Sequence, residues 1–516
     1  MHQASPQIKT TRHSMEKAEL GLEPSATPAI GGQVLLDVTF TADEEKKVVR
    51  KIDCIILPMM CFVFFCQYLD KQSLSYASVA GLITDLKMDA SQYSWCSSIF
   101  YIGQLVSEYP FIYLMSRLRL TKLSLESTSL TKANISIVWG GICMCLAAPE
   151  DFAGFAAVRF LLGFSEGAVS PAFVSITSYW YKKEEHAMRT ALWISMNAIA
   201  QVVGSLLMFG IAESKHLDIA PWRVMFIVCG AMTAAIGVIF FFAMPSGPSD
   251  AWFLNQREKE VLMARMARSH EGGDHKDFSM TQLKEALLDY KVFLIFCFGL
   301  LVTMQSPVLT FASLIIKGLG YSRHQTLLYT APSGAVQLVL IWLGVLMYRW
   351  FPRNRCAIAM ILCIPPLIGC FLLLKLPASA GWGVVVSSWL VSVLITIQAS
   401  CITAPWSMLL SLSASNIKGN TKRSVANAVF FIGYCAGCIA SPQLWKHSPR
   451  YFSGVVTAIV TWFLLIITTG SWWALCRREN QKRDAEGVEP ETMQMEDSFA
   501  GLDSTDKQDK AFRYSW

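Results

Sequence analysis

Long apolar blocks, separated by short polar stretches, are the feature that most constrains this chain. Examples are Ile52 to Tyr68, Val224 to Met244, Val292 to Ile316 and Val455 to Cys476. A helix of about 20 apolar residues spans the roughly 30 Å hydrocarbon core of a bilayer. Because every backbone amide in lipid needs a partner within the protein, each block should be helical. The chain is therefore predicted to be an all-α integral membrane protein.

The composition agrees with a lipid environment. The 516 residues are 53% hydrophobic and only 16% charged, whereas soluble proteins carry about 25% charged residues. The net charge of +6 comes from basic residues near the ends of the blocks, which we interpret as topology signals and not as a nucleic-acid surface. Most of the 15 cysteines lie inside the blocks, where a thiol packs as a small apolar group. Neither a disulfide framework nor a metal site at Cys435 and Cys438 is expected.

Twelve helical spans are predicted, six on each side of a charged central stretch. They lie near 52–69, 92–115, 135–149, 152–180, 188–211 and 222–244, and then near 291–316, 325–349, 356–376, 381–411, 424–445 and 453–476. The domains are then an N-terminal tail (1–51), a first six-helix half (52–245), a solvated linker (246–290), a second half (291–476) and a C-terminal tail (477–516). The polar composition of both tails predicts that they are unstructured.

The distribution of Lys and Arg over the short loops predicts the orientation. The loops on the side of the N-terminus hold more of these residues than the loops on the opposite side, and such an excess marks the cytoplasmic face. Both termini are therefore expected in the cytoplasm, and the plasma membrane is the expected location. The third span is short for a bilayer, because its apolar run begins only near Ile135.

The sequence contains no Gly-Lys dipeptide, so the phosphate-binding loop of an ATP-driven transporter is absent. An ion gradient is the energy source that we expect, with no cofactor. Ionisable residues inside the spans are the functional candidates, because each is costly in lipid unless it faces protein or water. The richest stretch runs from Arg159 through Gly163, Glu166, Gly167 and Ser170 to Pro171, and these residues share one helix face. Gly163 and Gly167 permit close backbone approach of a neighbouring helix. A buried Glu166 could carry a proton. The alternative is that Glu166 is paired with a structural partner and that Arg159 meets lipid headgroups.

The other candidates lie in several spans. Asp70 and Lys71 end the first span, where they either cap the helix or face a cavity. Facing a cavity, Asp70 is a candidate for the proton, and Lys71 or Arg159 would suit an anionic substrate. Glu108 precedes Pro110 in the second span and is a further candidate for the proton. Single amides that either line the site or bond between helices are Asn197, Gln305, Gln398 and Asn427.

Several motifs together resemble one known family. They are Tyr68-Leu-Asp-Lys-Gln-Ser-Leu-Ser-Tyr-Ala77, Glu108-Tyr-Pro110, the stretch from Arg159 to Pro171, Asn416-Ile-Lys-Gly419-Asn-Thr-Lys422-Arg423, and the terminal Asp506-Lys507 with Phe512-Arg-Tyr514. The chain resembles the fungal allantoate permease family, in the anion:cation symporter branch of the major facilitator superfamily. One departure is that the stretch 123–134 is longer than is usual between the second and third spans.

This resemblance implies the major facilitator fold, with twelve transmembrane helices in two pseudo-symmetric six-helix halves around one central site. It also implies proton-coupled uptake of a small organic anion of the allantoate, ureidosuccinate, vitamin or small-peptide class by alternating access. The expected partners are that substrate, protons and the lipid bilayer, and a monomer is expected. Alternatives are an exporter of a fungal secondary metabolite, a non-transporting nutrient sensor and, less favoured, a membrane-bound enzyme.

Overall fold

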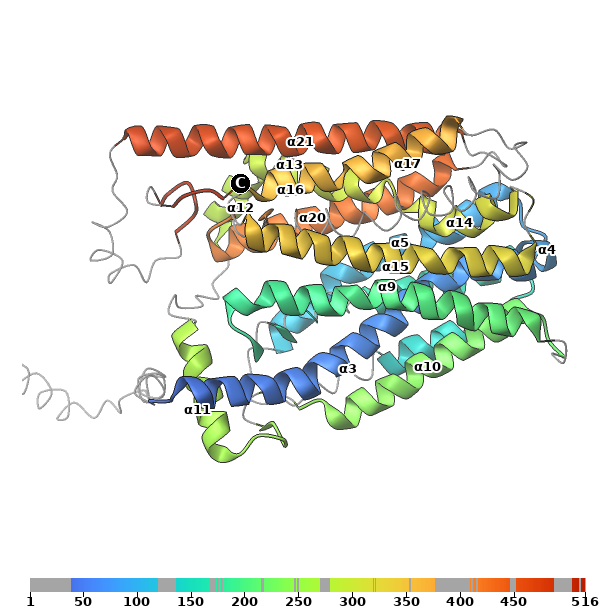
Figure 1. Cartoon of the computed structure of the whole chain (residues 1–516), viewed down its shortest axis with the longest axis horizontal. Coiled ribbons are helices and arrows are strands. Elements are labelled where there is room, and N and C mark those ends of the chain that lie inside the picture. The colour runs from blue at the N-terminus through green and yellow to red at the C-terminus, as the bar shows by residue number, and fades with distance from the viewer. Residues whose placement is uncertain are drawn as a thin grey trace, which may run out of the picture.

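The structure is a computed structural model, shown in Figure 1. It describes residues 39–118, 136–167, 180–214, 218–245, 250–269, 279–318, 322–351, 354–375, 416–445, 452–486, 504–509 and 512–515, with isolated residues between some of these ranges. Every regular element within these ranges is a helix. Most of the predicted tenth span and Gln398 lie outside the described residues.

The helices of the first half follow the predicted spans. They are α3 (Ala42–Ala77), its continuation through a π-helical turn (Ser78–Leu82) and α4 (Ile83–Asp85), α5 (Ala90–Leu118), the stretch Ser136–Cys145, α7 (Phe152–Glu166), α9 (Lys183–Glu213) and α10 (Pro221–Ala243). The third span is described only over Ser136–Cys145, and the stretch 123–134 before it lies outside the described residues. Thr41 and Glu44 form a reciprocal capping box that fixes the start of α3.

The second half contains broken spans. Its helices are α13 (Tyr290–Thr303), α14 (Pro307–Gly318), α15 (Arg323–Trp350), α16 (Arg355–Leu362), α17 (Ile364–Lys375), α20 (Asn420–Ala440), a 3₁₀ turn (Ser441–Leu444) and α21 (Phe452–Ala485). The predicted seventh span divides into α13 and α14 just before Pro307, whose ring favours the start of a new helix.

The central linker also contains helices, namely α11 (Gln256–Ser269) and α12 (Met280–Leu287). The expectation of a solvated linker is therefore wrong for these two helices: Arg265 of α11 and Gln282 of α12 are buried. The C-terminal tail differs from its expectation as well, because α21 continues to Ala485 and residues 504–509 and 512–515 pack against the second half.

Five described helical stretches are long and apolar enough to cross a membrane, and α12 with α13, bent by 65°, counts as a sixth if it is one span. These stretches keep large apolar side chains on their outer surfaces, including Phe242 at 80% exposure and Ile467 at 61%. Such a surface would be unfavourable in water and is what a helix presents to lipid. The chain is a multi-pass membrane protein.

The two halves repeat one packing arrangement. In the first half α3 packs against α9 and α10, and in the second half α13 packs against α20 and α21. Thus the first, fifth and sixth helices of each half occupy matching places, as expected for an internal repeat. The halves meet where α9 packs along α15, α5 along α20 and α3 along α14, and Figure 1 shows α9 and α15 side by side through the middle of the molecule.

Glycines allow the closest helix crossings. A Cβ atom on Gly163 of α7 would lie 1.9 Å from the Phe100 carbonyl oxygen of α5, and one on Gly299 of α13 would lie 2.2 Å from the Phe430 carbonyl oxygen of α20. Both distances are far below a van der Waals contact, so no larger side chain fits without moving a helix. The sequence-predicted role of Gly163 as a point of close backbone approach is confirmed.

Candidate functional site

A buried ion pair joins α3 and α7 in the interior of the first half. Lys71 Nζ lies 3.4 Å from Glu166 Oε1, and the Glu166 side chain is fully buried while Lys71 is 23% exposed. Glu166 is therefore close to a cation, and that cation keeps some access to solvent. The sequence named both residues but did not predict that they form a pair.

Aromatic rings surround the ammonium group of Lys71. Its Nζ lies 5.4 Å from the centre of the Phe100 ring and 5.6 Å from that of Tyr101, both on α5. Such distances allow cation–π attraction. The Tyr101 ring lies 6.2 Å from the ring of Tyr434 on α20, in the second half. Lys71 is thus placed where the two halves meet.

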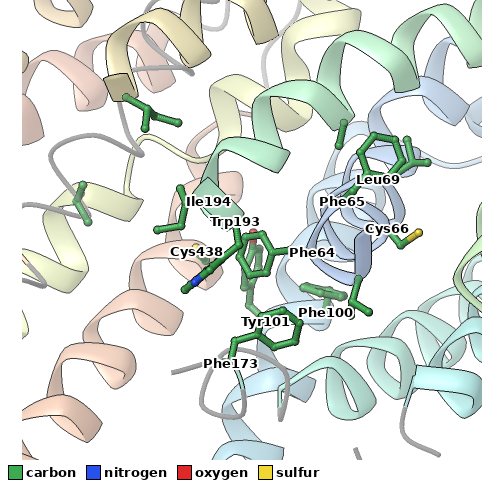
Figure 2. Close-up of a cluster of buried hydrophobic side chains, with 14 of the residues drawn as sticks. Phe64, Phe65, Cys66, Leu69, Phe100, Tyr101, Phe173, Trp193, Ile194 and Cys438 are labelled. Carbon is green, nitrogen blue, oxygen red and sulfur yellow. The ribbon is translucent and has the colours of Figure 1, made fainter. Parts of the chain in front are cut away.

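A second aromatic group lies on the same face of α3, about two turns before Lys71. Phe64 is seven residues earlier in the chain, so it projects from the same side of the helix. Its ring lies 4.5 Å from the Trp193 ring of α9 and 5.8 Å from the Phe173 ring. Figure 2 shows these rings, with Phe100 and Tyr101, gathered around one interior region. The surroundings of Lys71 therefore combine one cation with several flat apolar surfaces.

Arg159 lies next to Phe100, one of the two rings that contact Lys71. Its side chain is buried, at 2% exposure. Its Nε donates to the Cys96 carbonyl at 3.5 Å, and its guanidinium carbon lies 5.4 Å from the centre of the Phe100 ring. The alternative in which Arg159 meets lipid headgroups is wrong, because the side chain is buried between helices. Its position suits a residue that supports Phe100 more than one that contacts a substrate.

Asp70 faces away from Lys71. Consecutive residues on a helix point about 100° apart, so Asp70 faces α10 while Lys71 faces α5 and α7. Its Oδ2 accepts a hydrogen bond of 2.8 Å from Thr233 Oγ1, and its side chain is fully buried. The interpretation of Asp70 as a solvated helix cap is wrong, and its hydrogen bond is one between helices of the first half.

Glu108 lies on the face of α5 that carries Tyr101, seven residues further along. It is 9% exposed, and its Oε1 has no hydrogen-bond partner among the described residues. Gln104, on the same face between them, also has an amide oxygen without such a partner. Sequence reasoning missed Gln104, although its spacing from Tyr101 and Glu108 could have identified it.

The predicted amides take different positions. Gln305 donates to Thr461 Oγ1 of α21 at 2.5 Å, which is a structural bond between helices. Asn197 on α9 has an amide oxygen without a hydrogen-bond partner in the described part of the chain, and Asn427 is half-buried on α20. A chain of hydrogen bonds that the sequence did not predict links Gln72, Tyr68 and Gln201 between α3 and α9.

The halves contact each other at the end of the molecule that carries α4. There Ser75 Oγ lies 3.1 Å from Ser313 Oγ, and Tyr93 donates to the Thr310 carbonyl at 3.1 Å. Ser98 donates to the Ile439 carbonyl at 2.8 Å. At the opposite end, the described ion pairs join elements within one half, or join a half to its own linker or terminal segment. The described polar contacts between the two halves therefore lie on the α4 side.

The segment from Gly163 to Gly167 also matches the G-x-S-x-G pattern of a hydrolase nucleophile elbow. In the structure it continues the helix of α7 instead of forming a strand-to-helix turn. The Ser165 hydroxyl donates to the Leu162 carbonyl at 2.9 Å, in the preceding turn of the same helix. This geometry is that of an ordinary helical serine, and the match does not indicate a catalytic nucleophile.

An all-helical bundle with two repeated halves and a buried ion pair where they meet has the build of a secondary transporter. The sequence profile of the Major Facilitator Superfamily matches residues 60–442. The chain belongs to this superfamily, whose members are transporters and not enzymes.

Similar proteins agree with this assignment. An uncharacterized transporter of Schizosaccharomyces pombe is 34% identical, over 98% of this chain and 95% of the relative. The allantoate permease of Saccharomyces cerevisiae is 29% identical, over 93% of this chain and 88% of the permease. Among solved structures, a D-xylose-proton symporter superimposes with a TM-score of 0.57 at 15% identity, covering 80% of this chain and 96% of the symporter. This last likeness supports the fold alone.

Proposed function

We propose that this protein is a proton-coupled importer of a small organic anion, of the allantoate, ureidosuccinate, vitamin or small-peptide class. The observation that carries the proposal is the ion pair between Lys71 and Glu166, with Glu166 fully buried and Lys71 partly exposed. The likeness to allantoate permease supports both the carboxylate class and membership of the fungal allantoate permease family. Cytoplasmic termini and a location in the plasma membrane belong to the same proposal.

The pair suggests how substrate and proton are coupled. A carboxylate that enters the site competes with Glu166 for the single ammonium group of Lys71. When Lys71 turns to the substrate, Glu166 is left as a buried charge without a counterion, a state that proteins avoid by neutralising the group. A proton on Glu166 then compensates for the substrate's negative charge. Anion and proton binding support each other, which is the reciprocal linkage that symport requires.

The remaining predicted residues take supporting places in this proposal. The rings of Phe100 and Tyr101 both contact the ammonium of Lys71, and the guanidinium of Arg159 packs against Phe100. Glu108, on the same face of α5 as Tyr101, is the next candidate for the proton. Asn197 and Asn427, one from each half, are candidates for polar contacts with the substrate. Asp70 and Gln305 stabilise helix packing through Thr233 and Thr461.

The test is an uptake screen in cells that lack their own related permeases. Radiolabelled allantoate, nicotinate, pantothenate and a dipeptide are offered singly, with an empty vector as control. We expect concentrative uptake of at least one organic anion, greater at acidic than at neutral external pH. Net efflux of preloaded compounds, without uptake of any anion in the panel, would instead identify an exporter.

A further inference from the structure

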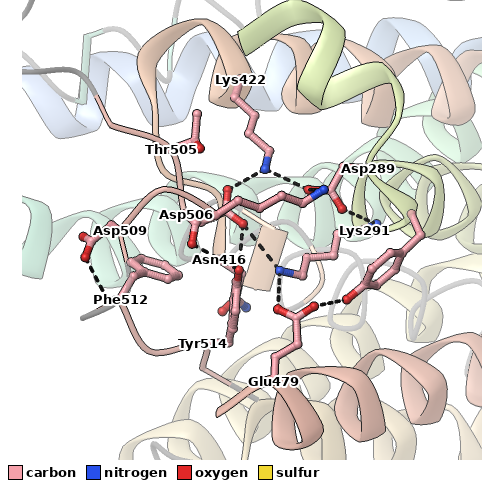
Figure 3. Close-up of polar contacts among 12 residues, drawn as sticks. Asp289, Lys291, Asn416, Lys422, Glu479, Thr505, Asp506, Asp509, Phe512 and Tyr514 are labelled. Carbon is pink, nitrogen blue, oxygen red and sulfur yellow. Dashed lines mark hydrogen bonds and ion pairs between the residues drawn. The ribbon is translucent and has the colours of Figure 1, made fainter. Parts of the chain in front are cut away.

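The C-terminal segment, defined here as residues 504–509 with 512–515, supplies a carboxylate to two buried lysines. Asp506 Oδ1 lies 2.7 Å from Nζ of Lys422, at the start of α20. Its Oδ2 lies 3.4 Å from Nζ of Lys291, at the start of α13. All three side chains are at most 1% exposed. Figure 3 shows Asp506 between the two lysines.

Further bonds hold the segment along its length. Tyr514 exchanges two backbone-to-amide bonds with Asn480 of α21, at 2.9 and 3.0 Å, and Ser515 exchanges two with Asn416, at 2.8 and 2.7 Å. The Tyr514 hydroxyl donates to Asp506 Oδ2 at 2.9 Å. Burial and the neighbouring Asp506 carboxylate raise the pKa of Tyr514, so the phenol stays a neutral donor. The Tyr514 ring also lies 3.4 Å from Lys291 Nζ, measured to the ring centroid. The segment is therefore held through side-chain and backbone atoms together.

The carboxylates of Glu285, Asp289 and Asp506 are close enough together to suggest a metal site. The ammonium of Lys422 contacts all three, at 2.8, 2.8 and 2.7 Å. A cation therefore already occupies the position that a metal would take. The cluster is an ionic contact between the segment and the ends of α12, α13 and α20.

The first half carries a matching contact with the charges reversed. Arg265 of α11 is fully buried, with Nε 2.8 Å from Glu45 and Nη2 2.5 Å from Glu185. Glu45 and Glu185 begin the first and fifth helices of their half, as Lys291 and Lys422 begin the equivalent helices of the second half. In each half, the chain that follows the sixth helix returns to pair with these two helix starts.

We propose that the C-terminal segment is an intramolecular peptide ligand, and that its docking surface on the second half binds the same peptide when it is supplied free. Bound, its Asp506 carboxylate bridges the ammonium groups of Lys291 and Lys422 and so holds the starts of α13 and α20 together, so that the second half moves as one body. Without it, Lys422 keeps Glu285 and Asp289 and Lys291 keeps Glu479, but no described carboxylate joins the two lysines. In the first half, Arg265 of the central linker holds the starts of α3 and α9 together through Glu45 and Glu185.

The test severs the segment after folding. A protease site is inserted in 487–503 of the full-length protein, which is purified, cleaved and mixed with a fluorescein-labelled synthetic peptide of residues 504–516. We expect saturable binding, whether the severed segment has been washed away or is displaced by exchange. Cleaved and washed protein should melt at a lower temperature, and added peptide should restore the original value.

Peptide variants provide matched controls of equal charge. Asp506→Asn should bind on the order of 100-fold more weakly, because it removes a buried carboxylate that Lys291 and Lys422 share. Asp509→Asn removes a partner of Lys418, which is 38% exposed, and should weaken binding much less.

Two results would overturn the proposal. One is unchanged melting after cleavage together with no peptide binding, and the other is equal binding of the wild-type and Asp506→Asn peptides. Neither readout uses a transported substrate, so they can fail or succeed independently of the importer assignment.

Discussion

Lys71→Ala is expected to lower uptake of the organic anion about 100-fold while leaving expression and surface delivery unchanged. Removing one partner of a buried ion pair costs about 3–5 kcal/mol, and about 1.4 kcal/mol corresponds to a tenfold change in an equilibrium constant. Since the Lys71 side chain is 23% exposed, we expect the lower end of this range. The measurement is initial uptake rate per surface-labelled transporter.

Lys87→Ala is the matched control for this change. Lys87 lies just beyond α4, and its side chain is exposed. Its removal should leave the uptake rate within about twofold, because exposed charges away from the site contribute little. If Lys71→Ala transports as well as Lys87→Ala, Lys71 is not the cation that meets the substrate.

Glu166→Gln is expected to abolish accumulation of substrate against its gradient while sparing exchange of substrate across the membrane. Glutamine keeps the size of the side chain and much of its hydrogen bonding, but it cannot take up a proton. The halves can still rock around a permanently neutral side chain, whereas a proton gradient can drive transport only if proton and substrate binding are linked. The measurement compares accumulation in energised vesicles with counterflow in de-energised ones.

The control for this change is Glu150→Gln, which alters an exposed carboxylate in the loop before α7. It should accumulate substrate as the wild type does. Should Glu166→Gln also accumulate substrate normally, the proton is carried elsewhere, and Glu108 with its unpartnered oxygen becomes the next residue to test. Loss of both accumulation and counterflow would show instead that the side chain is needed for rocking itself.

The sequence was sufficient for the architecture because the bilayer sets a length that apolar blocks must meet. The helices α3, α5, α9, α10, α15, α20 and α21 lie where the apolar blocks predicted spans. The breaks between α13 and α14 and between α16 and α17 were not predicted, because hydropathy measures the apolar length of a block and not the continuity of its backbone. The prolines near both breaks were the available signal.

The candidate site was predicted residue by residue but not as an arrangement. A costly charge in an apolar helix is visible in sequence, so Lys71, Glu166 and Asp70 could all be named. Which of them pair depends on the rotation of the helix about its axis. Consecutive side chains point about 100° apart, so Asp70 contacts Thr233 while Lys71 contacts Glu166. That rotation is fixed by neighbouring helices, through crossings such as Gly163 against Phe100, and not by local residue order.

The C-terminal segment shows the limit of composition most clearly. Its polar residues predicted an unstructured tail, since such stretches bury too little apolar surface to offset the entropy lost on folding. The segment folds because its partners are elsewhere in the chain, at Lys291, Lys422 and Asn480. Contacts of this kind depend on tertiary structure and leave no local periodicity to detect.

If Glu166 carries the proton, each anion that enters brings a proton with it. The most direct measurement uses purified protein in liposomes that contain a pH-sensitive dye, to which the anion identified by the screen is added from outside. We expect that substrate entry acidifies the lumen, that a protonophore abolishes accumulation, and that Glu166→Gln shows no acidification. Accumulation without proton movement, and unaffected by protonophore, would contradict it.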